Sequence, residues 1–289
     1  MRPYPVARPA GTRRPSARHL VALGLVALLS AGLPAGCDLG PSGSGAGGAA
    51  GDGPAAPTGP AAHTGPAVGQ PQSASVPGMS GWPAGERLTD PVVGYPEAGT
   101  GGWDLAPGQS AVIGARGPLL RFQVAVERDI TGLDRQDFAD RVVAVLAGPA
   151  SWAATGAWRL QRVDAGQPAS FTIHLATPAT RDVLCRSTSP DRYTSCRRDN
   201  RVVLNVARWA HGAPRYGDDL TSYREYMVNH EVGHRLGQGH ELCPGPGRPA
   251  PVMQQQTLGL HGCLPNPLVL LDGVRYAGPS GQYNDPIPR

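Results

Sequence analysis

Three histidines and one glutamate stand at fixed spacing in the segment 230–240, which reads His-Glu-Val-Gly-His-Arg-Leu-Gly-Gln-Gly-His. On a helix, His230 and His234 lie one turn apart on the same face, with about 5–6 Å between their Cβ atoms, so both can bind one metal ion. Glu231 then lies beside the ion without binding it, where a general base for a bound water belongs. The spacing therefore predicts a catalytic zinc site with Glu231 as the catalytic residue.

A third histidine can join this site only if the helix ends. His240 is too far along the chain to reach the ion from a continuing helix. Gly237 lacks a Cβ, so it readily takes a positive φ and turns the chain at a helix end. We therefore expect the helix to end at Gly237 and His240 to return as the third ligand of one zinc ion. The alternative is three solvated histidines at a helix end.

The full pattern H-E-x-x-H-x-x-G-x-x-H resembles the signature of the metzincin clan of zinc metalloendopeptidases, in which a methionine-containing turn follows. Here Met253 ends the sequence Ala-Pro-Val-Met, thirteen residues past His240. The resemblance implies that Met253 forms a hydrophobic floor beneath the zinc, with an ordinary core methionine as the alternative. It also implies a metzincin-like α+β fold: a twisted mixed sheet, a long zinc-binding helix and a small irregular C-terminal subdomain.

The region from about 119 to 267 also resembles an uncharacterised family of secreted, metzincin-like proteins of GC-rich bacteria. That family's name carries no function, so this likeness supports the fold more than the activity. The residues that carry it are Cys185, Cys196, the segments 205–209, 223–226 and 250–255, the zinc helix and Cys263.

Two positions depart from the better-known metzincins. Glu241 follows the third histidine, as in the astacin-like branch, where that residue holds the mature N-terminus. Here the N-terminus is expected far away on a linker, so this role is not carried over. The astacin-like turn also has a tyrosine shortly after its methionine, whereas Met253 is followed by three glutamines. The transition-state tyrosine is therefore unassigned, with Tyr276 and Tyr283 as alternatives.

The first 36 residues predict an export signal. Five arginines precede a short apolar stretch at 20–33, which is shorter than the roughly 20 apolar residues of a membrane-spanning helix. Small residues at 35 and 36 precede Cys37, as in a bacterial lipobox, although Pro34 stands where that box prefers leucine. We expect an acylated Cys37 that anchors the protein on the outer face of the cytoplasmic membrane. Plain secretion is the alternative.

Composition separates a linker from a folded domain. Residues 37–96 are rich in Gly, Pro and Ala and hold too few large apolar residues to offset chain entropy, so a disordered linker is expected. Residues 97–289 then form one metzincin-like zinc metalloprotease domain, which we expect to be a monomer. Without the signal, the formal charge falls from +4 to −1, because the signal holds five arginines and no acid. This charge argues against a nucleic-acid partner.

The spacing of apolar residues predicts the order of strands and helices in this domain. It predicts strands at 119–127, 158–163, 170–175 and 201–206, with a further short strand at 193–196. Asp134 is expected to cap a helix that runs to about Leu146. Asp218 or Asp219 is expected to begin the helix that carries the zinc motif.

The cysteines predict two disulfides. Acylation of Cys37 leaves four cysteines in an exported chain, and the local pairing among three connectivities is Cys185 with Cys196 and Cys243 with Cys263. A metal ligand or a latency switch is the alternative role for Cys243.

The remaining histidines are weaker candidates for the site. His174 and His211 are both considered as further ligands. His174 lies in a predicted strand of alternating polarity, so we expect it to be exposed or hydrogen-bonded within the protein rather than bound to metal. His261 lies in a turn and could touch zinc or substrate.

These patterns predict an exported zinc metalloendopeptidase acting on protein or peptide substrates. A bound water would lose its proton to Glu231, which would later protonate the leaving amine. The clan resemblance implies an extended substrate along an edge strand, for which we expect segment 186–198. Two alternatives stay open: a hydrolase of cell-wall peptides, and a non-catalytic zinc-containing surface lipoprotein that binds a partner. The carboxylate of Glu231 argues against the second, because structural zinc sites usually have four protein ligands and need no such base.

Overall fold

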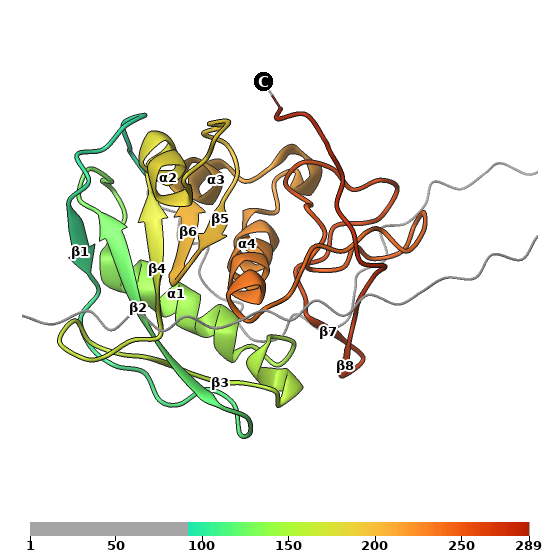
Figure 1. Cartoon of the computed structure of the whole chain (residues 1–289), viewed down its shortest axis with the longest axis horizontal. Coiled ribbons are helices and arrows are strands. Elements are labelled where there is room, and N and C mark those ends of the chain that lie inside the picture. Colours follow the sequence, from blue (N-terminus) through green and yellow to red (C-terminus); the bar gives the residue numbers. More distant parts are fainter. Residues whose placement is uncertain (1–91, 289) are drawn as a thin grey trace, which may run out of the picture. The chain divides into compact units, whose positions relative to one another are not determined.

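The computed structural model describes residues 92–288 (Figure 1). The expected signal, Cys37 and most of the expected linker lie outside the described residues. Within the described part, no helix is long and apolar enough to cross a membrane. The elements are β1 (Trp103–Leu105), β2 (Leu119–Glu127), α1 (Arg135–Ala147), η1 (Ala153–Thr155), β3 (Arg159–Arg162), β4 (Phe171–Ala176), α2 (Pro178–Cys185), β5 (Cys196–Arg198), β6 (Arg201–Asn205), α3 (Val206–His211), η2 (Pro214–Tyr216), α4 (Leu220–Arg235), β7 (Leu270–Leu271) and β8 (Val274–Arg275).

The fold is α+β, built on a mixed sheet with the strand order β1-β2-β4-β6-β5. Strands β2, β4 and β6 run parallel to one another, and β1 and β5 pair antiparallel at the two edges. Strand β3 pairs in parallel with the first half of β2, on the side of β2 opposite to β4. The sequence prediction of an α+β fold with a mixed sheet is confirmed at this level.

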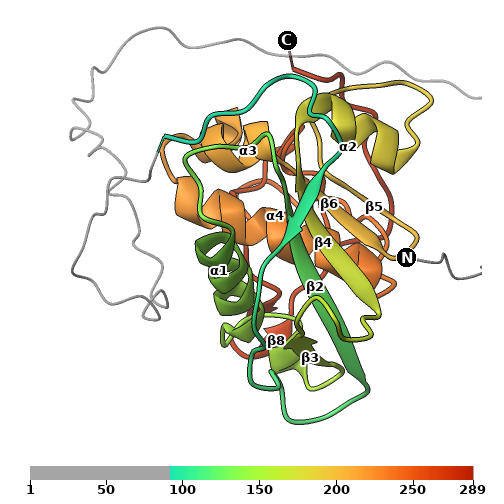
Figure 2. The same ribbon diagram turned by 90° about the vertical axis from the view of Figure 1, so that its left-hand side faces the viewer.

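The central strands are apolar because helices cover them. Phe122, Val124, Ile173 and Leu175 are all buried, as is typical of parallel strands packed on both faces. Helices α1 and α4 contact each other and lie on the same side of the sheet, α1 against β2 and α4 against β6 (Figure 2). Helix α4 is buried along most of its length, so its position is set by packing rather than by helix propensity.

Several predicted elements agree closely with the structure. Asp134 caps α1 by accepting hydrogen bonds from the backbone N–H groups of Gln136 and Asp137, at 2.7 and 3.1 Å. Asp219 caps α4 by accepting from the N–H of Ser222 at 3.0 Å. These short polar side chains satisfy donors that a helix cannot bond internally, which is why they mark helix starts in a sequence.

Other elements differ from the prediction. Strand β1 and helices α2 and α3 were not expected, and the short strand predicted at 193–196 instead runs from Cys196 to Arg198. The predicted strand 201–206 ends at Asn205, because this side chain accepts from the N–H of Ala207 and starts α3. Residues before 97 also join the fold, since Gly94 and Thr131 exchange two backbone hydrogen bonds of 2.9 and 2.8 Å.

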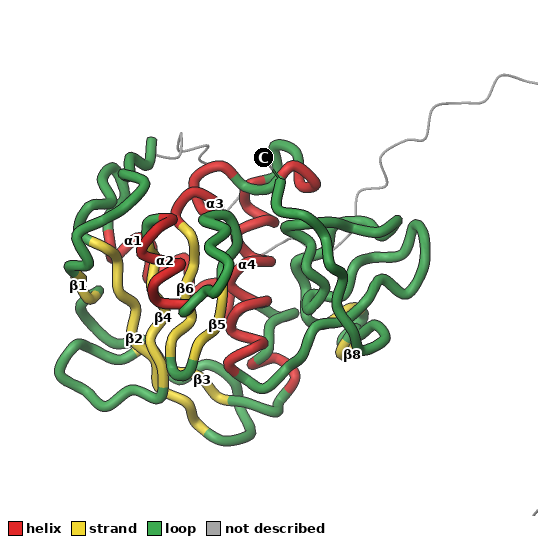
Figure 3. The backbone as a smooth tube through the Cα atoms, turned by 45° about the horizontal axis from the view of Figure 1, so that its top comes forward, coloured by secondary structure: helices red, strands yellow, loops and turns green. Residues whose placement is uncertain are grey.

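The chain after α4 consists mainly of turns and loops, with β7 and β8 as two-residue strands (Figure 3). A disulfide between Cys243 and Cys263 joins two of these loops, with the Cα atoms 5.8 Å apart. A second disulfide, between Cys185 and Cys196, joins the end of α2 to the start of β5. Both predicted pairings are confirmed. They leave Cys243 no free thiol for a metal or a latency switch.

Candidate metal centre

Helix α4 holds the first two histidines of the motif on one face. The ring centroids of His230 and His234 are 4.7 Å apart, and their Nε2 atoms are 3.1 Å apart. This closeness follows from the four-residue spacing, since residues i and i+4 are neighbours on a helix surface. Both side chains project towards one point beside the helix end.

The end of α4 brings in the third histidine. Gly237 has φ +89°, its N–H donates to the carbonyl of His234, and the N–H of Gln238 donates to the carbonyl of Gly233 at 2.9 Å. These two bonds form a Schellman motif, in which a residue with positive φ reverses the chain. The reversal places His240 Nε2 3.1 Å from His234 Nε2. The three predicted ligands thus lie together in the structure.

Hydrogen bonds at the opposite ring nitrogens set the tautomers. The Nδ1 atoms of His230 and His234 lie 2.8 and 2.9 Å from the carbonyl oxygens of Val252 and Gln238. A carbonyl can only accept, so each Nδ1 carries the proton and each Nε2 presents a lone pair. Burial lowers the pKa of His234 to about 4 and that of His230 well below its usual value, with neighbouring histidines adding to the latter. Neutral imidazole is the form that binds metals.

Lone pairs packed this closely repel unless a cation lies among them. In a tetrahedral zinc site with Zn–N distances of about 2.0–2.1 Å, neighbouring ligand nitrogens are about 3.3–3.4 Å apart. The observed separations of 3.1 Å are close to that spacing, and the possible ligand atoms of all three histidines lie within 4.8 Å of one another. Three imidazoles whose Nδ1 atoms each face a hydrogen-bond acceptor fit a divalent first-row metal such as zinc.

Glu231 is the remaining polar group of the motif, and it lines the same cavity as the histidines. Its carboxyl is buried, and its Oε2 has no hydrogen-bond partner among residues 92–288. Burial raises the pKa of Glu231 to about 8, and the charge of Arg181 opposes this shift. A cation held by the histidines would lower that pKa and favour the carboxylate. An unpartnered carboxylate beside a metal can take a proton from a water.

The turn at residues 251–254 packs against α4 and contacts the histidine cluster. The N–H of Gln254 donates to the carbonyl of Pro251 at 2.9 Å, and Val252 within this turn supplies the acceptor for His230. Met253 is fully buried and packs directly against Gly233 of α4. Any side chain at Gly233 would displace the methionine, so a glycine inside the motif permits this close approach.

Replacing Gly233 with alanine is expected to lower the free energy of unfolding by about 1–3 kcal/mol. The added Cβ would lie 2.5 Å from Met253 Sδ and 2.8 Å from Trp152 Cζ2. Trp152 cannot move freely, because its Nε1–H donates to the Asn229 carbonyl at 2.7 Å. Chemical denaturation measures the change. The matched control is Gly239→Ala, where a Cβ meets nothing within 4 Å; equal stability of the two variants would contradict this packing argument.

The histidines open onto a cavity of about 510 Å³. One wall is formed by β5 and the residues just before it, which belong to the segment expected to face a substrate. The opposite wall follows Met253 in the chain. Lining residues include Thr194, Ser195, Arg197, Met227, Thr257 and Leu258. Strand β5 is the last strand of the sheet, so its outer backbone groups are not used by another strand of the described chain.

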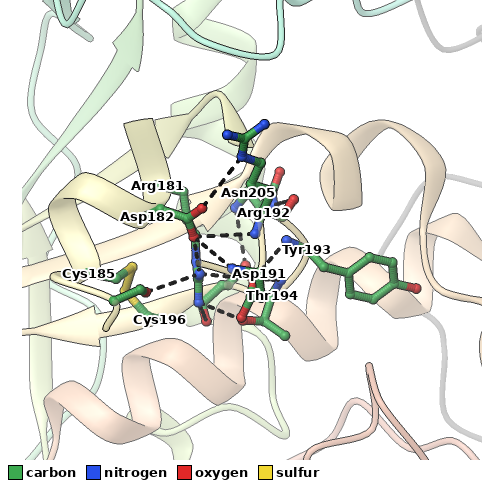
Figure 4. Close-up of a disulfide and its surroundings, with 11 residues drawn as sticks. Arg181, Asp182, Cys185, Asp191, Arg192, Tyr193, Thr194, Cys196 and Asn205 are labelled. Carbon is green, nitrogen blue, oxygen red and sulfur yellow. Dashed lines mark hydrogen bonds and ion pairs between the residues drawn. A yellow bond between two sulfur atoms is a disulfide. The ribbon is translucent and has the colours of Figure 1, made fainter. Parts of the chain in front are cut away.

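A buried arginine holds the β5 wall in place. Arg181 Nη1 contacts Asp182 and Asp191 at 2.6 and 2.9 Å, and its Nη2 donates to Thr194 Oγ1 at 2.6 Å (Figure 4). The disulfide from Cys185 to Cys196 lies beside this network. Paired and hydrogen-bonded charges of this kind specify one geometry for a loop that has little apolar core of its own.

The other residues considered from the sequence lie away from the cavity lining. Tyr276 donates its hydroxyl hydrogen to the Pro249 carbonyl, so it is engaged elsewhere. Tyr283 stacks on His261, with ring centroids 3.4 Å apart, and that histidine pairs with Asp285 at 2.8 Å. His174 packs edge-on against the ring of Trp103. None of these side chains lines the cavity over the three histidines.

One contact to the site was missed from the sequence. Gln282 lies near the C-terminus, and its Oε1 is 3.1 Å from His240 Nδ1. The N–H of Gly281 also donates to the His240 carbonyl, and Leu242 donates to Pro279. The contact joins residues 42 positions apart across irregular chain, so no local pattern could have indicated it.

Comparison with known proteins gives one finding. A family model described as "Protein of unknown function (DUF3152)" matches residues 89–266. This stretch contains the sheet from β1 to β6, helices α1 to α4, the three histidines, Met253 and all four disulfide cysteines. No curated protein and no solved structure gives a significant match to the chain. Because the matched stretch covers more than half of the 289 residues, the chain belongs to the DUF3152 family of proteins of unknown function.

Proposed function

We propose that this protein is an exported zinc metalloendopeptidase with a metzincin-like fold. The observation that carries the proposal is the convergence of three imidazole Nε2 atoms in one cavity beside Glu231, whose Oε2 has no hydrogen-bond partner among residues 92–288. Export is supported by the predicted signal at residues 1–36 and by two disulfides, which persist in oxidising compartments. The positive φ at Gly237 and the buried Met253 beside α4 support the likeness to the metzincin clan.

His230, His234 and His240 would hold the zinc ion through Nε2. When bound, zinc supplies a Lewis acid that polarises a peptide carbonyl and lowers the pKa of a water ligand towards about 7. The residues of the chain do the rest. Glu231 accepts the proton of the attacking water on a carboxylate oxygen and delivers it to the nitrogen of the leaving amine. The Val252, Gln238 and Gln282 acceptors keep the three rings oriented.

The ligand count also favours catalysis over a structural role. Within residues 92–288, the cluster that could hold a metal comprises three residues, whereas structural zinc sites usually have four protein ligands. A three-ligand site leaves a coordination position for water or substrate. The neighbouring edge strand β5 can pair with an extended peptide through its outer N–H and C=O groups. These two features together support a peptide as the substrate.

Cleavage of a diverse peptide pool by the purified, zinc-loaded protein tests this function. Mass spectrometry of the products, with a chelated sample alongside, is expected to show internal cuts that need zinc. Cuts that persist in the chelated sample would point to a contaminating protease. A folded, zinc-loaded protein that cuts no peptide in the pool would overturn the general endopeptidase. A parallel digest of purified cell-wall peptides then separates a wall-peptide hydrolase from a non-catalytic binding protein.

Replacing Gln282 with alanine is expected to weaken zinc binding about 10- to 100-fold, since acceptors on the second ring nitrogen orient a histidine ligand. Competition with a fluorescent zinc chelator measures the dissociation constant without any substrate. Ser280→Ala is the matched control in the same tail, because Ser280 contacts Glu241 through its backbone. Unchanged affinity in the Gln282 variant would show that this contact does not position His240.

A further inference from the structure

The charged groups around the cavity are few and unevenly placed. Apart from the three histidines, the lining residues that carry an ionisable charge are Glu231 and Arg197. Glu231 lies on α4 and belongs to the proposed chemistry. Arg197 lies on the opposite wall, in the edge strand β5, and the proposed reaction gives it no role. A cation on the wall of a substrate cavity calls for an explanation of its own.

Arg197 has no hydrogen-bond or ion-pair partner in the described part of the chain, and the residue is exposed. The nearest acid along the chain, Asp199, already pairs with Arg186 at 3.7 Å. An unpaired guanidinium offers five N–H donors in a planar fork that matches a carboxylate. It is therefore free to bind an anion from outside.

Arg197 also lies close to the metal ligands. It lines the same cavity as the three histidines, and its strand β5 packs against α4, which carries His230 and His234. Arg235, the residue after His234, does not line the cavity: its Nη2 donates to the Ser170 carbonyl at 3.0 Å and its guanidinium lies over the Phe171 ring. Arg197 is thus the cation of this cavity lining that is available to a ligand.

The backbone beneath Arg197 is held firmly. Cys196, the preceding residue, is disulfide-bonded to Cys185, and Arg197 pairs in register with Val202 of β6. The stretch before it is fixed by the bonds of Arg181 to Asp191 and Thr194 (Figure 4). The Cα of Arg197 therefore has a fixed place on the cavity wall, from which its side chain can reach one region of a bound substrate.

We propose that Arg197 selects substrates that carry a carboxylate beside the bond to be cut. This inference rests on the proposed function, because it assumes that a peptide lies along β5 over the metal site. The carboxylate can be the side chain of an aspartate or glutamate, or the free C-terminus of the peptide. Both present the same planar anion to the guanidinium.

The test compares peptides that differ only in this anion. One set carries Asp or Glu at successive positions and a matched set carries Asn or Gln, each with either a free or an amidated C-terminus. Cleavage is measured with zinc-loaded wild type, Arg197→Ala and Arg198→Ala. Arg198 is the matched control, since it neighbours Arg197 on β5 and is exposed but does not line the cavity. Binding of fluorescently labelled peptides to the Glu231→Gln variant, with and without Arg197→Ala, gives a readout that needs no hydrolysis.

Wild type and Arg198→Ala are expected to favour the anionic peptides roughly 5- to 20-fold in kcat/KM, and Arg197→Ala to remove that preference. Loss on amidation alone would identify the C-terminus as the source of the anion. A preference that is absent in wild type, or that survives in Arg197→Ala, overturns the inference. If no peptide is cut but anionic peptides still bind through Arg197, the anion-binding role of Arg197 is supported and the proposed hydrolysis is overturned. If both sets are cut equally, the Arg197 inference is overturned and the peptidase activity is retained. If no peptide is cut and none binds preferentially, both proposals are overturned.

Discussion

Replacing Glu231 with glutamine is expected to reduce peptide hydrolysis about 10²- to 10⁴-fold while the protein stays folded and keeps its zinc. Glutamine has the same shape as glutamate but cannot accept a proton, and loss of a general base costs typically 10²–10⁴-fold in rate. The side chain lies in the cavity beside the three histidines without belonging to the ligand cluster. The rate falls through loss of proton transfer, so the zinc content measured by metal analysis is expected to remain one ion per chain.

Glu225 provides a control for this substitution on the same helix. It precedes Glu231 by six residues on α4 but does not line the cavity. Glu225 is half-buried, and burial raises its pKa to about 7, so it is also a carboxyl in a partly desolvated place. Glu225→Gln is expected to leave kcat within about twofold of wild type, because the residue does not line the cavity. Hydrolysis that survives in Glu231→Gln would show that another group, or another protein in the sample, performs the reaction.

The stability of the Glu231 variant separates chemistry from misfolding. Burial raises the pKa of Glu231 to about 8, so in the metal-free protein at about pH 7 the carboxyl must take up a proton on folding, and this lowers stability. An uncharged amide of the same size removes that cost. We expect the midpoint of thermal unfolding of the metal-free protein to stay the same or to rise. A large fall would mean that lost activity reports unfolding, and the kinetic comparison would then carry no weight.

Local patterns predicted the parts of the site that depend on neighbouring residues. The four-residue spacing on a helix brings His230 to His234, and a glycine with positive φ brings back His240; both follow from backbone geometry alone. The caps at Asp134 and Asp219 were predictable for the same reason. Such features need no knowledge of how distant segments pack.

Long-range contacts were out of reach. Gln282 meets His240 through loops with no periodicity, and the Arg181 network depends on where α2 packs against β5. Helix α2 itself is eight residues long and follows β4 after a single residue, Thr177, so its pattern is hard to separate from that of the strand. The charge of Arg197 could be read from the sequence, but its place on the cavity wall needed the pairing of β5 with β6. The contacts that could not be predicted from the sequence are those between residues far apart along the chain, whatever their residue types.

Removing one zinc ligand is expected to have a large effect on both metal content and stability. In His234→Ala, bound zinc should fall from one ion per chain to below about 0.1, because the central ring, with Nε2 3.1 Å from each of the others, is gone. Two ligands rarely hold zinc at micromolar concentrations. Metal analysis after gel filtration measures the loss directly.

The same substitution should abolish zinc-dependent stabilisation. A ligand present at about 1,000 times its dissociation constant stabilises the folded state by about 4 kcal/mol, which corresponds to roughly 8–16 °C in Tm for a domain of this size. Wild type should therefore melt well below its zinc-loaded Tm when a chelator is added, whereas His234→Ala should melt at one temperature under both conditions. His211→Ala is the control, since His211 is an exposed residue at the end of α3 and should keep the full zinc response. A zinc-dependent Tm that persists in His234→Ala would place the metal elsewhere in the chain, and Glu231 would then lose its role as a base beside it.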